Sequence, residues 1–125
     1  MTHRATIALV VSLAAVALFT GGLAWLFDTG RAPRGATRAE RLYVGLCADC
    51  HGVDGRGSWR ARLFLIKPGD FTDGTQIGQD TDQYLAEIIK NGGSPLGRPG
   101  MPGFPQLSGE DIQALVAYVR SLSRR

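Results

Sequence analysis

The sequence has few of the side chains that bind metals or carry redox chemistry. It contains only two cysteines, Cys47 and Cys50, and two histidines, one of which is His3 near the N-terminus. A structural zinc site needs four ligands, and no second cysteine pair follows the first. A disulfide between Cys47 and Cys50 would close almost no loop and would add little stability. A thioredoxin-like redox pair requires a βαβ context, which the sequence does not show.

The chain also lacks a strong charge bias outside its N-terminal stretch. The formal net charge of the 125 residues is +3, but residues 36–125 carry 11 basic and 10 acidic side chains. We therefore predict no nucleic-acid partner, because such proteins present a basic surface. The 17 glycines and 6 prolines indicate that loops make up much of the domain. A domain of about 90 residues buries limited apolar surface by itself, so a bound group would have to supply part of its core.

What is present is Cys47-Ala48-Asp49-Cys50-His51, the C-x-x-C-H signature of covalent haem attachment. Two thiols at this spacing can reach the two vinyl groups on one edge of a haem. The histidine that follows then lies under the iron as the proximal ligand. Both cysteines of the chain are in this motif. We predict one covalently bound haem c, attached through Cys47 and Cys50 and ligated by His51.

The N-terminal segment contains the only long apolar run. Residues 5–27 include no charged side chain, and as a helix they would span about 34 Å, enough to cross a membrane. A signal peptide has a shorter apolar core of about 7–15 residues and a small-x-small cleavage site, and neither feature is found here. We predict a retained transmembrane anchor over residues 1–27, with an uncleaved or cleaved signal as the alternative. Residues 28–36 then form a short polar linker, and residues 37–125 form the globular domain.

Capping signals divide the globular part into three predicted helices separated by glycine-rich loops. Thr37 and Glu40 form a capping box that starts a helix toward Cys47. A second helix begins at Asp80 or Thr81 and ends near residues 91–93, and a third runs from residue 108 to residue 121 or beyond. Residues 52–80 are predicted to be irregular, and residues 93–107 form a Gly/Pro-rich loop.

This layout and several local motifs resemble the class I cytochrome c domain, over residues 37–124. The matching segments are Leu42-Tyr43 before the first cysteine, Cys50-His51-Gly52-Val53-Asp54-Gly55-Arg56-Gly57, Lys67-Pro68-Gly69-Asp70-Phe71-Thr72-Asp73, Gly100-Met101-Pro102-Gly103-Phe104 and Leu115-Val116-Ala117-Tyr118-Val119. The resemblance implies an all-α fold, in which helices and Gly/Pro-rich loops wrap around a covalently bound haem. One transmembrane helix precedes this domain.

The second axial ligand is predicted to be Met101. The only other methionine is Met1, and Met101 lies between Gly100 and Pro102 in a loop too rich in glycine and proline to be ordinary core. A buried methionine that fills a gap is the alternative. Methionine raises the reduction potential of a haem, and an iron with two protein ligands suits electron transfer.

One departure from the resembled family concerns the partner of the His51 ring. The family has a proline in the glycine-rich loop whose carbonyl accepts the Nδ1–H of the proximal histidine, but this chain has no proline between His51 and Pro68. An acceptor is still expected, because it orients the ring. Trp59 is predicted either to pack near the haem or to be an ordinary core or surface indole. The basic cluster of Arg56, Arg60, Arg62 and Lys67 is interpreted either as a solvated loop face or as a site for haem propionates or an acidic partner.

The predicted function is electron transfer between membrane partners, without catalysis by the chain itself. The partners would be redox proteins such as an oxidase, a dehydrogenase or a quinol-oxidising complex. Two alternatives are a gas- or peroxide-reactive haem protein with a labile methionine, and a structural haem subunit. Arginines after the apolar run favour a cytoplasmic domain by the positive-inside rule. Haem attachment of the resembled type occurs outside the bacterial inner membrane, so we predict a single-pass inner-membrane protein with a periplasmic domain.

Overall fold

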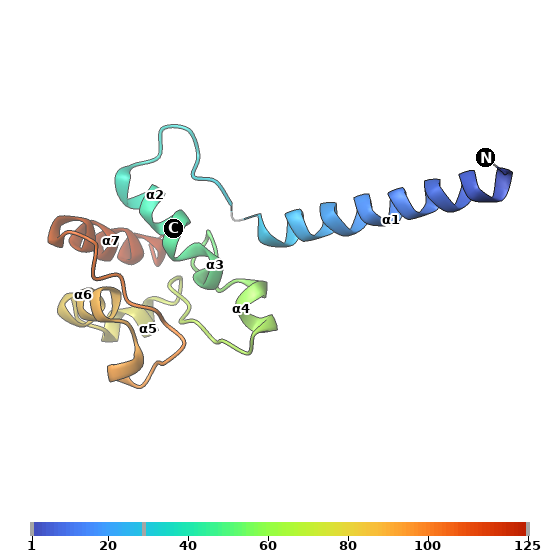
Figure 1. Ribbon diagram of the computed structural model, residues 1–125. Coiled ribbons are helices and arrows are strands. Elements are labelled where there is room, and N and C mark those ends of the chain that lie inside the picture. The colour runs from blue at the N-terminus through green and yellow to red at the C-terminus, as the bar shows by residue number, and fades with distance from the viewer. Residues whose placement is uncertain (1, 29, 125) are drawn as a thin grey trace.

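All regular elements of the part that the computed structural model describes, residues 2–28 and 30–124, are helices, and the predicted all-α fold is confirmed (Figure 1). The elements are α1 (His3–Phe27), α2 (Arg38–Leu46), α3 (Ala48–His51), α4 (Trp59–Leu63), α5 (Gly74–Gln79), α6 (Asp82–Asn91), the 3-10 turn η1 (Ser94–Leu96) and α7 (Gly109–Leu122).

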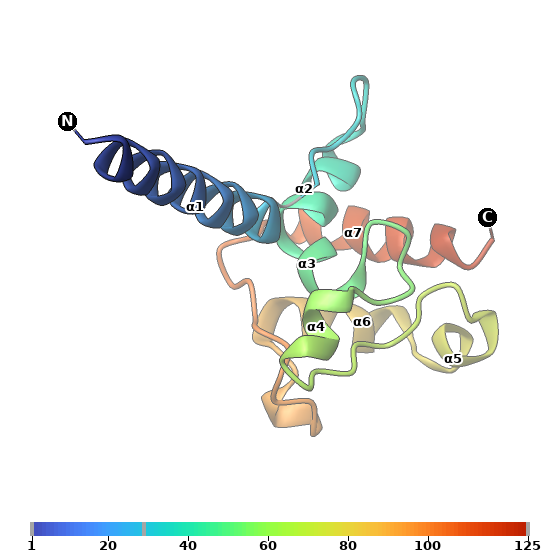
Figure 2. The same cartoon turned by 90° about the vertical axis from the view of Figure 1, so that its right-hand side faces the viewer.

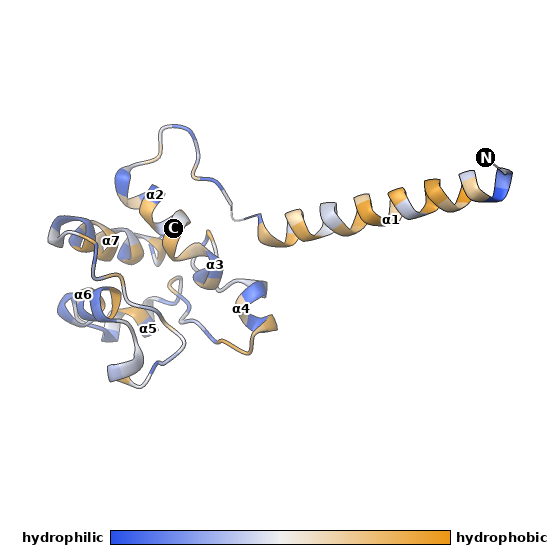
Figure 3. Cartoon of the chain, viewed as in Figure 1, coloured by the Kyte–Doolittle hydropathy of each residue, from blue (hydrophilic) through white to orange (hydrophobic). Residues whose placement is uncertain are grey.

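The long helix α1 projects away from the globular part and buries none of its residues (Figure 1). It has 25 residues, about 37 Å at the usual helical rise, and a mean hydropathy of 2.3 over its most apolar window. Figure 3 shows apolar residues along most of the length of this helix. Its length and composition are those of a membrane-crossing helix, and a signal sequence would meet the same criteria.

Helices α2, α6 and α7 form the core, with α7 between the other two (Figures 1 and 2). The predicted caps are present: the side chains of Thr37, Thr81 and Ser108 each accept a hydrogen bond from a backbone amide in the first turn. The apolar faces of these helices meet in one cluster. Its most buried members are Tyr43, Leu115, Val116, Leu122, Ile77, Ile112 and Val119.

Two arginines connect the helix ends. Arg38, at the start of α2, makes two hydrogen bonds to the Asp111 carboxylate at the start of α7, from Nε and from Nη2 (2.8 Å to Oδ2). Arg120, near the end of α7, donates to the carbonyls of Ile77 (2.7 Å) and Asp80 (2.5 Å). The C-terminal end of α5 is therefore attached to α7, which carries much of the core.

The prediction that residues 52–80 are irregular is wrong in part, because α4 and α5 lie within them. Each is short, with five and six residues respectively. Each starts with a capping side chain: Ser58 accepts from the amide of Arg60, and Asp73 accepts from those of Thr75 and Gln76. Helices of this length have too few residues to show a helical period in the sequence.

Candidate haem site

The Cys47–His51 motif forms a single helical turn, α3, that directly follows α2. The amide of His51 donates to the carbonyl of Cys47 at 2.8 Å, which brings both cysteines and the histidine to one wall of a cavity. Gly52 then ends the turn with a φ of 76°. Glycine is favoured here because other residues rarely adopt this left-handed conformation.

Three hydrogen bonds fix the backbone around this turn. The Tyr43 hydroxyl donates to the carbonyl of Gly52 at 2.8 Å, and the Tyr43 side chain is fully buried. The amides of Gly57 and Ser58 donate to the carbonyls of His51 and Cys50, both at 2.8 Å. The glycine-rich segment therefore folds back on the motif and restricts where the His51 ring can lie.

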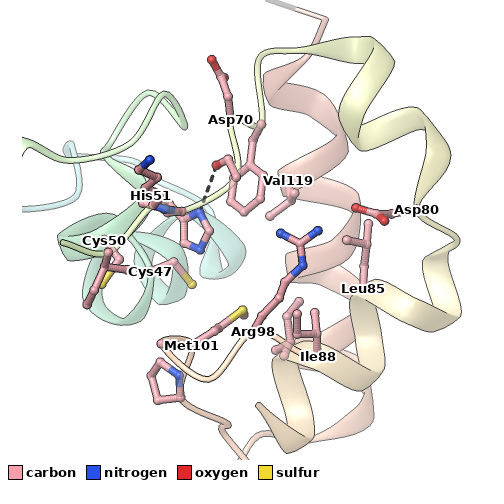
Figure 4. Close-up of a pocket in the computed structure, with 18 of the residues that line it drawn as sticks. Cys47, Cys50, His51, Asp70, Asp80, Leu85, Ile88, Arg98, Met101 and Val119 are labelled. Carbon is pink, nitrogen blue, oxygen red and sulfur yellow. Dashed lines mark hydrogen bonds between the residues drawn. The ribbon is translucent and has the colours of Figure 1, made fainter. Parts of the chain in front are cut away.

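The His51 ring has two neighbours that set its orientation. Its Nδ1 lies 3.4 Å from the carbonyl oxygen of Gly69, which can only accept, so Nδ1 carries the proton and Nε2 is left to bind a metal (Figure 4). The Phe71 ring stacks on the imidazole with a centroid distance of 4.3 Å and an interplanar angle of 14°. Burial lowers the pKa of His51, which favours the neutral form that metal ligation requires.

Gly69 supplies the acceptor that the sequence left open. The family's acceptor is a proline carbonyl in the glycine-rich loop, and here the carbonyl belongs to the residue after Pro68. Sequence reasoning did not find it because Gly69 is 18 positions from His51, and any backbone carbonyl in the loop was a candidate. Phe71 was noticed only within a segment similar to the family and received no role. Because its ring stacks on the imidazole, Phe71 helps to orient His51.

The two thiols are not joined by a disulfide. Burial and the neighbouring Cys50 raise the pKa of Cys47 to about 12. Burial and the Asp49 carboxylate raise the pKa of Cys50. Both side chains line the cavity, so both sulfurs are available at the same wall as His51 (Figure 4).

The loop that carries Met101 is attached by backbone contacts to the end of α6. The amide of Gly93 donates to the carbonyl of Met101 at 2.9 Å, and the amide of Phe104 donates to that of Ile89 at 2.9 Å. A Cβ on Gly103 would lie 2.6 Å from the amide nitrogen of Gly92, so the two backbone segments pack without any side chain between them. These contacts give Met101 a defined position although it belongs to no long helix.

The cavity between these elements has a volume of about 420 Å³, within the range of cofactor-sized pockets. Figure 4 shows the His51 imidazole and the Met101 thioether turned toward the same space from two different elements. Apolar side chains of α6 and α7 line the interior, among them Leu85, Ile88, Ile89, Leu115 and Val119. The donor set and the apolar walls fit a haem attached at one edge by the two cysteines.

Polar groups are found at the cavity rim. Lys67, Asp70, Asp80 and Arg98 all contribute to the lining, and Figure 4 shows Arg98 extending from the Met101 loop toward the interior. Arg98 was not singled out in the sequence, because an isolated arginine in a loop carries no local signal. Trp59 does not line the cavity, which favours the surface indole of the two alternatives that the sequence left open for it. Its ring instead stacks on Trp25 of α1, and Trp59 is 49% exposed.

Fold and cavity together define a domain of the cytochrome c type. The chain belongs to the family described as "Cytochrome C oxidase, cbb3-type, subunit III", whose model matches residues 34–119. The solved structure of the KustC0563 c-type cytochrome is similar, with a TM-score of 0.57 and 29% identity, over 69% of this chain and 98% of that one.

A curated relative points to the same group of proteins. Cytochrome c oxidase subunit 2 of Alkalihalophilus pseudofirmus is 33% identical over 79 residues, which are 61% of this chain. The match spans only 22% of the length of that relative. The shared part is therefore one domain of a longer protein. A cytochrome c domain indicates an electron carrier that holds covalently bound haem.

Proposed function

We propose that this protein is a membrane-anchored monohaem cytochrome that passes single electrons between redox proteins of one membrane. The observation that carries the proposal is that Cys47, Cys50, His51 and Met101 all line one cavity. The thiols of Cys47 and Cys50 would hold the porphyrin edge, and Nε2 of His51 and the thioether of Met101 would bind the iron. When bound, the haem supplies a centre that is reduced and oxidised by one electron.

The chain's own residues limit what happens at this centre. An iron held by His51 and Met101 would have no open position for a substrate, and the attachment of the Met101 loop to α6 opposes loss of the methionine. The apolar walls exclude water from the interior, so little solvent has to rearrange when the charge changes. These features support electron transfer over substrate chemistry, and peroxide chemistry would also need a distal acid–base group.

The anchor and the compartment are part of the same proposal. Residues 1–27 cross the bacterial inner membrane once, residues 28–36 connect them to the domain, and residues 37–125 form the haem domain in the periplasm. The apolar character of α1 supports the anchor. We place the domain in the periplasm because covalent haem attachment of this type occurs there. The arginines that follow α1 would favour the opposite orientation by the positive-inside rule. A C-terminal reporter enzyme that is active only outside the cytoplasm tests this orientation.

The partners proposed are membrane-bound oxidoreductases, with a terminal oxidase as the first candidate. The support is that the matching family and the curated relative both have names of oxidase subunits. Purification of the tagged chain in mild detergent, followed by mass spectrometry, tests whether the protein is a fixed subunit of a complex or a tethered shuttle. Stoichiometric recovery with oxidase or dehydrogenase subunits indicates a fixed subunit. Recovery alone from the membrane fraction indicates a tethered shuttle.

Carbon monoxide binding to the reduced, haem-loaded protein tests the ligand assignment. The native protein should not bind carbon monoxide at neutral pH, whereas Met101→Ala should bind it, because the sixth position becomes free. Leu96→Ala is a matched control, since Leu96 is in η1 near the same loop but does not line the cavity. Ready binding by the native protein would replace this proposal with a gas-reactive haem protein.

Attachment through both cysteines is tested separately. Mass spectrometry of the native chain should find one haem that denaturing extraction does not remove. Cys50→Ala should retain a haem with one unsaturated vinyl group, which shifts the absorption of the pyridine haemochrome to longer wavelength. An unshifted spectrum in this variant would contradict the attachment at Cys50.

A further inference from the structure

The globular domain has a run of exposed apolar side chains at the end of α4. Leu63, Phe64 and Leu65 follow one another directly and are 63%, 72% and 90% exposed. Leu65 has a φ of 58°, a left-handed conformation that is unfavourable for leucine. Contiguous exposed apolar surface commonly marks a contact site with a membrane or a protein.

Helix α4 lies on the side of the domain from which α1 departs, as the two views in Figures 1 and 2 show. The Trp25 ring, near the end of α1, stacks on the Trp59 ring of α4 with a centroid distance of 5.9 Å and an interplanar angle of 21°. Tryptophan is enriched at the boundary between membrane and water. If α1 spans the bilayer as proposed, this contact brings α4 to the same boundary.

Arg60 of α4 strengthens the contact by binding the open end of α1. Its Nη2 donates to the carbonyls of Asp28 (2.6 Å) and Trp25 (3.4 Å). The last carbonyls of a helix have no partner within it and carry partial negative charge, so a guanidinium is favourable there. The same guanidinium lies 5.6 Å from the Trp59 ring centroid and 3.4 Å from the Asp49 carboxylate. One side chain thus connects α1, α4 and the Cys47–His51 motif.

The charges around the apolar run are of one sign. Residues 55–69 contain four basic side chains and no acidic one. Arg60 is engaged with α1, and Arg62 and Lys67 flank the apolar run on its two sides. Apolar side chains bordered by basic ones are the pattern with which protein segments bind at the surface of anionic lipid.

We propose that α4 and Leu63–Leu65 rest on the bilayer that α1 crosses. The apolar side chains enter the boundary between headgroups and acyl chains, and Arg62 and Lys67 meet anionic phospholipid headgroups. This inference rests on the proposed membrane anchor and adds to it a second, surface contact. Leu65 and Lys67 also line the haem cavity, whereas Leu63 and Phe64 do not, so the latter two carry most of the apolar contact and the cavity rim lies next to the membrane.

Photo-crosslinking of the full-length, haem-loaded chain in nanodiscs tests the contact. The discs contain phosphatidylcholine and phosphatidylglycerol, and Phe64 is replaced by p-benzoylphenylalanine. The matched control carries the same group at Leu96, an exposed apolar residue of η1. Because only Phe64 is expected to reach lipid, mass spectrometry should find about tenfold more phospholipid adduct there than at Leu96.

The outcomes distinguish this inference from the anchor on which it rests. Equal lipid adducts at the two positions, in a chain that resists carbonate extraction, would overturn the surface contact and leave the anchor intact. Adducts at Phe64 formed with protein in native membranes would also overturn it, in favour of a protein partner. If carbonate releases the protein from the membrane, the proposed anchor is wrong, and this inference fails with it.

A second variant tests the junction itself through the orientation of the haem. In stacked, oriented membranes the electron paramagnetic resonance signal of the native haem should depend on the angle to the magnetic field. Arg60→Gln should weaken that dependence, because the bonds to the end of α1 are lost. Arg56→Gln, from the same basic cluster, should not. Equal angular dependence in all three proteins would show that Arg60 does not orient the domain.

Discussion

Removing the Tyr43 hydroxyl tests whether the turn that carries His51 depends on a single buried hydrogen bond. The hydroxyl donates to the Gly52 carbonyl at 2.8 Å, and the side chain is fully buried. Burial raises the pKa of Tyr43, so the donor stays protonated over the whole accessible pH range. Tyr43→Phe retains the ring and its packing but leaves the carbonyl without this partner.

The expected cost is about 2 kcal/mol, because a buried acceptor left unsatisfied loses more than the net value of one hydrogen bond. For a domain of this size that corresponds to a fall in Tm of roughly 10 °C. Thermal unfolding of the haem-loaded protein, followed by circular dichroism and by haem absorption, measures it. Thr75→Val is the control, since it removes a hydroxyl from an exposed residue that does not line the cavity. A Tm within about 1 °C of the native value for Tyr43→Phe would refute the reasoning.

Two further predictions concern the helix ends and the methionine loop. The side-chain hydrogen bond from Arg38 lowers the pKa of Asp111, so this pair stabilises the fold above the carboxyl's unfolded pKa of about 4 and ceases to do so as the pH falls through the lower folded value. Asp111→Asn should therefore lower the Tm at pH 7 but not at about pH 2, and an equal difference at both would contradict the assignment. Gly103→Ala places a Cβ 2.6 Å from backbone atoms of the α6 end. It should loosen Met101 enough for the reduced protein to bind carbon monoxide. Gly109→Ala, whose Cβ meets nothing within 4 Å, should not, and identical behaviour of the two variants would argue against backbone packing as the cause.

The sequence predicted those parts of the fold that depend on neighbouring residues. Thr37 and Glu40 form the capping box as expected, and Thr81 rather than Asp80 caps α6. A cap joins side chain and backbone over two or three positions, so its signal is local. The same holds for the Cys47–His51 motif, whose geometry is set within one helical turn.

Contacts between distant residues could not be predicted in this way. The acceptor of the His51 proton is a backbone carbonyl, and every residue of the loop offers one. The stacking of Trp59 on Trp25 joins two segments that the sequence separates by a linker of glycine and proline. Arg60 was assigned to a basic cluster by composition alone, although its partners are carbonyls at the end of another helix.

The stacking of Trp25 on Trp59 has a practical consequence for work on the isolated domain. A soluble fragment that begins after Phe27 lacks the Trp25 ring and carbonyl. It would expose the face of the Trp59 ring on which Trp25 stacks in the full chain, and aromatic side chains favour association with other proteins. Docking rates or complexes measured on such a fragment would therefore include contacts made by an aromatic surface that the truncation exposes. The full-length protein in a lipid environment is the appropriate material for finding its electron partners.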